Sequence, residues 1–251
     1  MDRINVVIYG CGVMGCLTAQ ALLAKKSFEI VGAIDNASDL VGKDLGELLQ
    51  GSKKLGITVE KDADEVLSRV NAQAAVLTTS SHIATVFPQI AQCLKAGLNV
   101  ITTSEELSFP WNRDPERAGK IDDLAKEQGV TVVGTGINPG YLMDTLPLVL
   151  TAPCLEVNSI QVNRMMNSAK RRLPFQIKVG TGLTKEEFTK KIENKSITGH
   201  VGLLESIHMI AAGLCWDLQE ATELPPEPVI SENLIETPLC KVEPGQVIGL
   251  R

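Results

Sequence analysis

The first 150 residues alternate short apolar runs with segments of helical spacing. Continuous apolar runs predict buried strands of a parallel sheet, here at 4–9, 29–34, 74–79, 99–103 and 130–134. Helical spacing predicts helices at 13–25, 62–70, 83–96 and 113–128. The last two should stop at Gly97 and Gly129, since glycine is favoured just beyond a helix end. Repeated strand–helix units predict a parallel sheet with helices on both faces.

The rest of the chain does not continue the regular alternation of strands and helices. A long strand is expected at 155–166, followed by a basic, loop-like stretch to Gly182. A capping box at 184–187 should open a helix, and a second helix is expected at about 199–216. A proline-rich break at 224–228 precedes strand-like runs at 229–235 and 246–250. The chain stops inside this last strand pattern, so the domain is expected to continue beyond Arg251.

These patterns predict an α/β protein of two domains. Residues 1–150 should form a domain of the Rossmann type, a doubly wound parallel sheet. Residues 151–251 should form an α+β domain for substrate binding and oligomerisation, and a homodimer or other homo-oligomer is expected.

Composition narrows the possible partners and the compartment. The net charge of −6 argues against nucleic acid or an anionic membrane as a partner, and no apolar stretch reaches the length of a bilayer span. The 6 cysteines form no C-x-x-C pair, which is typical of reduced thiols in the cytoplasm. No set of histidine, cysteine and acidic residues has metal-ligand spacing, so no metal is predicted.

A glycine-rich motif follows the first predicted strand. Residues 10–15 read G-x-G-x-x-G and open the first predicted helix. Gly10 permits the tight turn, Gly12 lets a pyrophosphate approach the backbone, and Gly15 lets helix and strand pack closely. Val13 and Met14 begin the helix, whose N-terminal N–H groups and dipole attract phosphates. The motif therefore predicts a site for NAD or NADP.

Asp35 stands at the end of the second predicted strand, 20 residues after Gly15. A carboxylate there accepts hydrogen bonds from ribose hydroxyls and repels a 2′-phosphate, which favours NAD. Asn36, Ser38 and Lys43 follow closely and could accommodate that phosphate, so NADP stays open.

Hydroxyl groups follow two further strands. Thr79 and Ser80 end one strand and Thr103 ends the next, at the sheet edge where a dinucleotide is bound. Each is equally consistent with an ordinary helix cap. The 134–140 loop, with three glycines and Asn138, predicts a backbone held close to the nicotinamide ring.

Several segments together resemble the 2,4-diaminopentanoate dehydrogenase family, within the dihydrodipicolinate reductase-like NAD(P)-dependent group. They are the fingerprint, the Glu-Glu-Leu after Thr103–Ser104, the Gly-Ile-Asn-Pro-Gly loop, the 199–206 helix start and, most specifically, 171–184. The resemblance covers the whole chain. It implies NAD(P)-dependent oxidation of the C4 amine of 2,4-diaminopentanoate to 2-amino-4-oxopentanoate and ammonia, in ornithine degradation. Dihydrodipicolinate reductase itself is a poorer match, since its paired histidines and Lys-x-Asp-Ala-Pro-Ser-Gly-Thr segment are absent.

A diamino acid substrate requires a cation for its carboxylate. Arg171 and Arg172 are candidates because a guanidinium binds a carboxylate bidentately, although both also suit a solvated loop. Arg164 is a third candidate. Thr181, between Gly180 and Gly182, could hold the carboxylate as the Gly-Thr of dihydrodipicolinate reductase does.

The same substrate requires an anion for its second ammonium and a base for the reacting amine. The 199–216 helix is apolar nearly all round, so it should be buried, with Glu205 in its middle. Glu205 is a candidate for binding the ammonium or for acid–base work, with a structural ion pair as the alternative. His200 should start this helix, where the dipole favours the neutral base, but it suits a cap or packing equally well.

Three classes of function remain open. The first is an amino-acid dehydrogenase that takes a small diamino acid. The second is a related NAD(P)-dependent reductase of imines or cyclic precursors. The third is a non-enzymatic NAD(P)-binding regulatory protein.

Overall fold

The fold is described from a computed structural model covering residues 3–49, 53–170, 173–197, 200–236 and 239–251. The chain divides into two compact units. The first unit comprises Met1–Leu155 and Glu205–Asp217, and the second comprises Glu156–Leu204 and Leu218–Arg251. Residues Glu205–Asp217 therefore belong with the first unit, although they follow the expected boundary at residue 150 by more than fifty positions.

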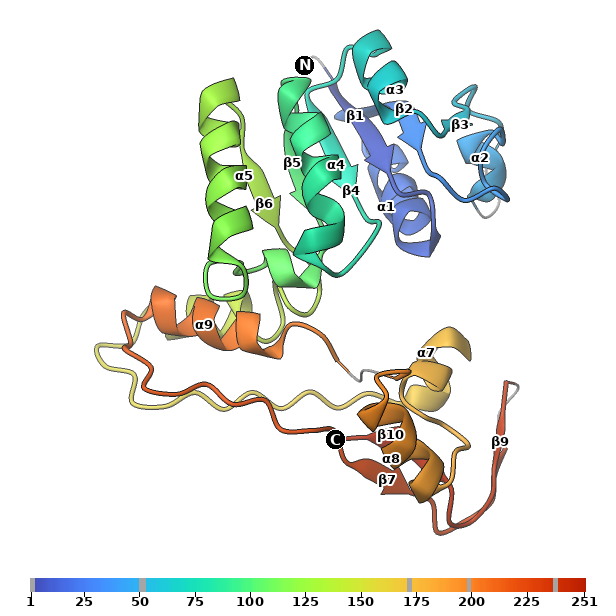
Figure 1. Cartoon of the computed structure of the whole chain (residues 1–251), viewed down its shortest axis with the longest axis vertical. Helices are drawn as coiled ribbons and strands as arrows, with labels where there is room; N and C mark the ends of the chain where they lie inside the picture. Colours follow the sequence, from blue (N-terminus) through green and yellow to red (C-terminus); the bar gives the residue numbers. More distant parts are fainter. Residues whose placement is uncertain (1–2, 50–52, 171–172, 198–199, 237–238) are drawn as a thin grey trace. The chain divides into compact units, whose positions relative to one another are not determined.

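The first unit is built on a six-stranded sheet in the order β3-β2-β1-β4-β5-β6 (Figure 1). All neighbouring pairs are parallel. The order reverses direction between β1 and β4, as in the Rossmann fold, so the predicted doubly wound sheet is confirmed. The strands are β1 (Ile4–Tyr9), β2 (Phe28–Ile34), β3 (Val59–Glu60), β4 (Ala74–Leu77), β5 (Asn99–Thr102) and β6 (Val132–Gly134).

Local signals set the helix ends of this unit. Asp62 caps one helix by accepting from the Glu65 amide, and Asp114 caps another by accepting from Arg117. Gly129 ends the latter in the left-handed conformation, as predicted. The helices are α1 (Val13–Leu23), α2 (Leu45–Leu48), α3 (Ala63–Arg69), α4 (Ile83–Lys95), α5 (Pro115–Gln128), α6 (Thr145–Thr151), α9 (Leu203–Gly213) and the 3₁₀ helix η1 (Glu105–Leu107).

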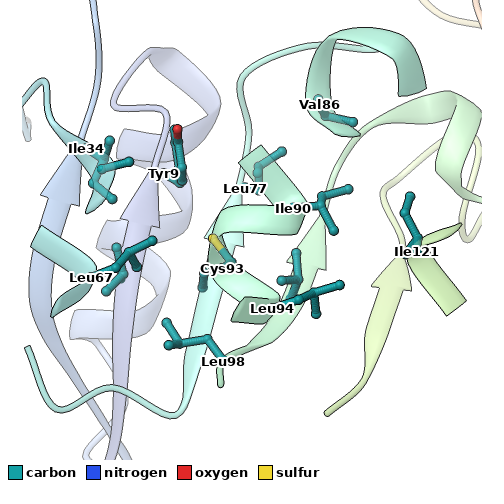
Figure 2. Close-up of a cluster of buried hydrophobic side chains, with 14 of the residues drawn as sticks. Tyr9, Ile34, Leu67, Leu77, Val86, Ile90, Cys93, Leu94, Leu98 and Ile121 are labelled. Atoms are coloured by element: carbon teal, nitrogen blue, oxygen red, sulfur yellow. The ribbon is translucent and has the colours of Figure 1, made fainter. Parts of the chain in front are cut away.

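Apolar side chains cover both faces of the sheet. Alternate residues of β1 point to opposite faces: Val7 and Tyr9 join one cluster, while Val6 and Ile8 join the other. Figure 2 shows the first cluster, in which Ile90 and other residues of α4 pack on the sheet. Burial on two faces explains why these strands are continuous apolar runs.

The second unit is small. Its two antiparallel pairs are β7 with β10 and β8 with β9. The capping box at its longest helix is confirmed, with Thr184 and Glu187 each accepting from the other's amide. The elements are η2 (Ser168–Lys170), α7 (Leu173–Lys178), α8 (Lys185–Glu193), β7 (Pro228–Ile230), β8 (Ile235–Glu236), β9 (Lys241–Val242) and β10 (Val247–Leu250).

Three predictions for this half of the chain differ from the structure. Residues 155–166, all described, form no strand, because an apolar run makes a strand only where a partner accepts its ladder of hydrogen bonds. The loop-like stretch before Gly182 contains η2 and α7. The run at 229–235 forms two short strands, broken where the Ser231 hydroxyl donates to the Asn233 carbonyl.

The helix expected at 199–216 is shorter than predicted. It begins at Leu203, directly after Gly202, whose φ of 101° lies in the left-handed region. Only Glu205, Ser206 and Ala211 of α9 are buried. The expectation of a helix buried all round is therefore wrong, and two of the three buried residues, Glu205 and Ser206, are polar.

Candidate dinucleotide and active site

The three glycines of the turn have three different environments. Gly10 has a φ of 101°, and a Cβ on Gly15 would lie 1.8 Å from the Gly10 carbonyl oxygen. Around Gly12, by contrast, no heavy atom of the described residues, apart from those of its immediate chain neighbours, lies within 4 Å of the position of a Cβ. The backbone of the turn is thus tightly packed at Gly10 and Gly15, whereas the space beside Gly12 is open. A pyrophosphate can approach the backbone there. Val13 and Met14 follow as exposed residues that start α1.

Asp35 lies directly beside this turn. Its Oδ2 accepts from the Cys11 amide at 2.6 Å, and its Oδ1 accepts from the Ala37 amide at 2.9 Å. A carboxylate has about four acceptor positions, so these two bonds orient Asp35 and leave it able to accept from ribose hydroxyls. Burial raises the pKa of the Cys11 thiol to about 12, so a neutral thiol underlies the turn.

The hydroxyls that follow β4 make local hydrogen bonds. Thr78 Oγ1 donates to the Gly10 carbonyl at 2.8 Å, which ties β4 to the glycine-rich turn. Thr79 Oγ1 donates to Gln89 Oε1, and Ser80 Oγ accepts from the His82 amide. Thr79 and Ser80 therefore organise the start of α4 at the expected edge of the sheet. Thr103 lies at the same edge, where its amide donates to the Leu77 carbonyl.

Two adjacent glutamates, which the sequence does not distinguish, have different environments in the structure. Glu106 accepts from the Ile83 amide at 2.8 Å and pairs with His82 Nδ1 at 3.0 Å, so it joins the segments after β4 and β5. Within the described residues, the side chain of Glu105 makes no hydrogen bond or ion pair. Among the described residues, Glu105 is therefore a carboxylate without a side-chain partner at the carboxyl edge of the sheet. Sequence reasoning missed it because its strand-end position was the only signal.

The loop after β6 is tied down by a buried carboxylate. Asn138 precedes Pro139 through a cis peptide bond, and Gly140 follows with a φ of 107°. Asp144, fully buried, accepts from the Gly140 amide at 2.7 Å and from the Ser206 hydroxyl at 2.8 Å. The predicted nicotinamide loop is thus a fixed element at the carboxyl edge of β6.

Glu205 is buried in an ion pair. Its side chain is 1% exposed, and its Oε1 accepts from Arg113 Nε at 2.7 Å. This is the structural pair that the sequence left open as the alternative to substrate binding. The other oxygen, Oε2, is buried without a hydrogen-bond partner in the part of the chain that the structure describes.

The remaining candidates belong to the second unit. The Oγ1 atom of Thr181 is buried and has no hydrogen-bond partner among the described residues. The amides of Thr181 and Gly182 donate to the carbonyls of Gln176 and Val247, which leaves the Thr181 hydroxyl as the group of this segment that could hold a carboxylate. Arg164 contacts the Met166 sulfur. Arg171 and Arg172 lie outside the described residues.

His200 does not lie in the first turn of α9, because the helix starts three residues later. The helix dipole acts mainly within the first turn, so it gives little support to His200 as the base.

Across the described ranges, no helix is long and apolar enough to cross a membrane, and no group of three potential metal ligands occurs.

Comparison with known proteins identifies relatives of both halves. The family model for the N-terminus of dihydrodipicolinate reductase matches residues 4–135, and that for the C-terminal domain of 2,4-diaminopentanoate dehydrogenase matches residues 141–251. The 2,4-diaminopentanoate dehydrogenase of Acetoanaerobium sticklandii is 35% identical, over 99% of this chain and 70% of that protein. The amine dehydrogenase of Streptomyces virginiae is 24% identical, over 72% of this chain and 51% of that protein.

A solved structure extends the likeness to three dimensions. The amine dehydrogenase from Mycobacterium smegmatis superimposes with a TM-score of 0.78 at 27% identity, covering 99% of this chain and 73% of that one. The fold, the glycine-rich turn and these relatives define an NAD(P)-dependent oxidoreductase that acts on amines. The chain belongs to the 2,4-diaminopentanoate dehydrogenase family. The predicted family and enzyme class are confirmed.

Proposed function

We propose that this protein catalyses the oxidative deamination of 2,4-diaminopentanoate to 2-amino-4-oxopentanoate and ammonia. The observation that carries the proposal is the 35% identity to a 2,4-diaminopentanoate dehydrogenase over 99% of the chain. A nicotinamide held at the glycine-rich turn would supply the hydride acceptor for the amine-bearing C4 of the substrate. Water then adds to the resulting C4 imine and ammonia leaves.

NAD is the proposed cofactor. Asp35 is oriented by two backbone amides at the end of β2, and its negative charge disfavours a 2′-phosphate. Gly12 and the first turn of α1 accept the pyrophosphate, because N–H groups at a helix N-terminus attract anions. Asn138 and the neighbouring backbone of the loop after β6 face the nicotinamide. A cytoplasmic homo-oligomer remains our prediction, as does a role in ornithine degradation.

Two residues are proposed for proton transfer at the reacting amine. Glu105 is favoured by its position after β5 and by its lack of a side-chain partner within the described residues. His200 is the alternative from the sequence. The base must lie within hydrogen-bonding reach of the proton that it removes. A substitution that abolishes deamination but leaves cofactor binding intact therefore identifies the base. Glu105→Gln and His200→Asn are the variants to compare, with Glu106→Gln as the matched neighbour.

The substrate carboxylate and the C2 ammonium require opposite charges. Arg171, Arg172 and Arg164 are the proposed partners of the carboxylate, with Thr181 Oγ1 as a buried hydroxyl that can donate to it. Arginine→alanine at the true partner should lower kcat/KM for 2,4-diaminopentanoate by about 10²-fold. It should lower kcat/KM for 1,3-diaminobutane, which lacks the carboxylate, much less. Unchanged discrimination between the two compounds would place the carboxylate elsewhere.

The decisive assay follows NADH formation with 2,4-diaminopentanoate and NADH oxidation with 2-amino-4-oxopentanoate and ammonia. We expect turnover in both directions, with the reverse reaction dependent on ammonia. Turnover of cyclic imines alone would indicate the reductase instead. NADH binding without turnover of either substrate class would indicate a regulatory protein.

A further inference from the structure

Asp144 is a buried carboxylate held by neutral donors. Its Oδ2 accepts from the Gly140 amide at 2.7 Å and from Ser206 Oγ at 2.8 Å, and its Oδ1 accepts from the Thr145 amide at 2.5 Å. The side chain is 0% exposed. A buried charge is costly unless hydrogen-bonded, so these donors specify one conformation for the residues that carry them.

Through the Gly140 amide, Asp144 binds the loop that follows β6. Thr102 of β5 pairs with Gly134 of β6, so the loop leaves the sheet at its carboxyl edge. The loop is folded tightly on itself: a Cβ on Gly140 would lie 2.3 Å from the Gly136 amide nitrogen. The Thr145 hydroxyl also donates to the Gly140 carbonyl at 3.1 Å. Asp144 therefore fixes both the amide of Gly140 and the start of α6.

Ser206 comes from a distant part of the chain. It lies on α9, 62 residues after Asp144, and the chain on both sides of Glu205–Asp217 belongs to the second unit. Its neighbour Glu205 binds Arg113, in the segment that follows η1. Two consecutive residues of α9 thus attach to the segments that follow β5 and β6, and Figure 1 shows α9 below them.

We propose that Asp144 and Ser206 are a positioning pair that holds the loop after β6 in place for hydride transfer. This inference rests on the proposed function, since it assigns that loop to the nicotinamide side of the site. The pair touches neither reacting atom. It acts through the Gly136–Gly140 backbone, and small displacements of positioning elements cost rate more than affinity.

The test compares Ser206→Ala and Asp144→Asn with Ser68→Ala in the full chain. Ser68 is the matched control, a helical serine of the same unit whose hydroxyl donates to a carbonyl of its own helix. Three readouts are needed: hydrogen exchange at the amides of Gly140 and Thr145, NADH affinity by fluorescence titration, and kcat with the primary isotope effect from C4-deuterated NADH.

Ser206→Ala should speed exchange at the Gly140 amide and keep the NADH Kd within about twofold. It should lower kcat by about tenfold and raise the isotope effect, because hydride transfer becomes slower than product release. Asp144→Asn should do the same more strongly, and Ser68→Ala should change none of these. A loss of NADH affinity in proportion to kcat, with an unchanged isotope effect, would reveal a purely structural role and overturn the proposal. Unchanged hydrogen exchange at the Gly140 amide in the variants would overturn the positioning role, whatever the substrate is. If the wild-type protein turns over no diamino acid, only the proposed function is overturned.

Discussion

The Nε atom of Arg113 donates to Oε1 of Glu205 at 2.7 Å, although 92 residues separate them along the chain. The two partners are unequally buried, since Glu205 is 1% exposed and Arg113 is 38% exposed. The Glu205 carboxylate is almost completely desolvated, whereas the Arg113 guanidinium keeps part of its hydration. Loss of one partner should therefore cost more than loss of the other.

Arg113→Ala should destabilise the protein by about 2–3 kcal/mol, because it leaves an unpaired charge buried on Glu205. Glu205→Gln should cost only about 1 kcal/mol, because the half-exposed Arg113 can be hydrated. Urea unfolding of both variants measures the difference. Equal losses would contradict this account of the pair.

The same Glu205→Gln variant tests whether Glu205 also binds substrate. If its buried Oε2 binds the C2 ammonium, kcat/KM for 2,4-diaminopentanoate should fall by about 10²-fold, a larger effect than loss of stability can explain. The activity of 1,3-diaminobutane should fall equally, since its second amine is retained. Wild-type kinetics in this variant would leave Glu205 with its structural role alone.

Gly12 and Gly15 should respond oppositely to substitution. Gly12→Val adds a side chain in open space, so the fold should remain while NADH affinity is lost. Gly15→Ala places a Cβ 1.8 Å from the Gly10 carbonyl oxygen, so the turn must deform and thermal stability should fall sharply. Circular dichroism melts and NADH titrations separate the two effects. Near-normal NADH binding by Gly12→Val would rule out the pyrophosphate assignment.

Asp35→Asn should change cofactor preference without opening the turn. The amide oxygen can still accept from the Cys11 amide although the bond from the Ala37 amide is lost, and the charge that repels a 2′-phosphate is removed. We expect kcat/KM with NADP to rise relative to NAD by about tenfold, which corresponds to about 1.4 kcal/mol. The measurement is kcat/KM with each cofactor. A constant ratio would mean that Asp35 does not face the ribose.

Alkaline pH should destabilise the protein through its buried thiols. Burial raises the pKa of Cys11 and Cys93 from 9.0 to about 12, so the unfolded chain releases these protons first as pH rises. The free energy of unfolding should therefore fall between pH 9 and about 12, by about 1.4 kcal/mol per pH unit for each thiol. Urea midpoints across this range test the slope, and a flat profile would contradict it.

Alkylation offers an independent measurement on the same thiols. Cys154 and Cys215 are exposed and should react with iodoacetamide in the folded protein, whereas Cys11 and Cys93 should react only on unfolding. Mass mapping after short exposure distinguishes the sites. Early modification of Cys11 would show that the turn opens far more readily than its packing indicates.

The dinucleotide unit was predictable because its signals are local. The strands of the sheet that were predicted agree with the structure to within two residues at each end, since apolar runs and glycine stops are properties of short segments. β3, with only two residues, was missed because it has no periodicity and exists through its pairing with β2. The false strand at 155–166 is the converse case, an apolar pattern without a partner.

The Rossmann sheet, the glycine-rich turn, the acidic residue at the end of β2 and the family all follow from the amino-acid sequence alone. These features depend on residues close together in the chain. The three-dimensional structure was needed to show that Glu105 and Glu106 differ, that α9 packs with the first unit, and that Glu205 and Ser206 bind Arg113 and Asp144. Those contacts join segments 62 and 92 residues apart, and no local pattern records which distant side chains will share a buried site.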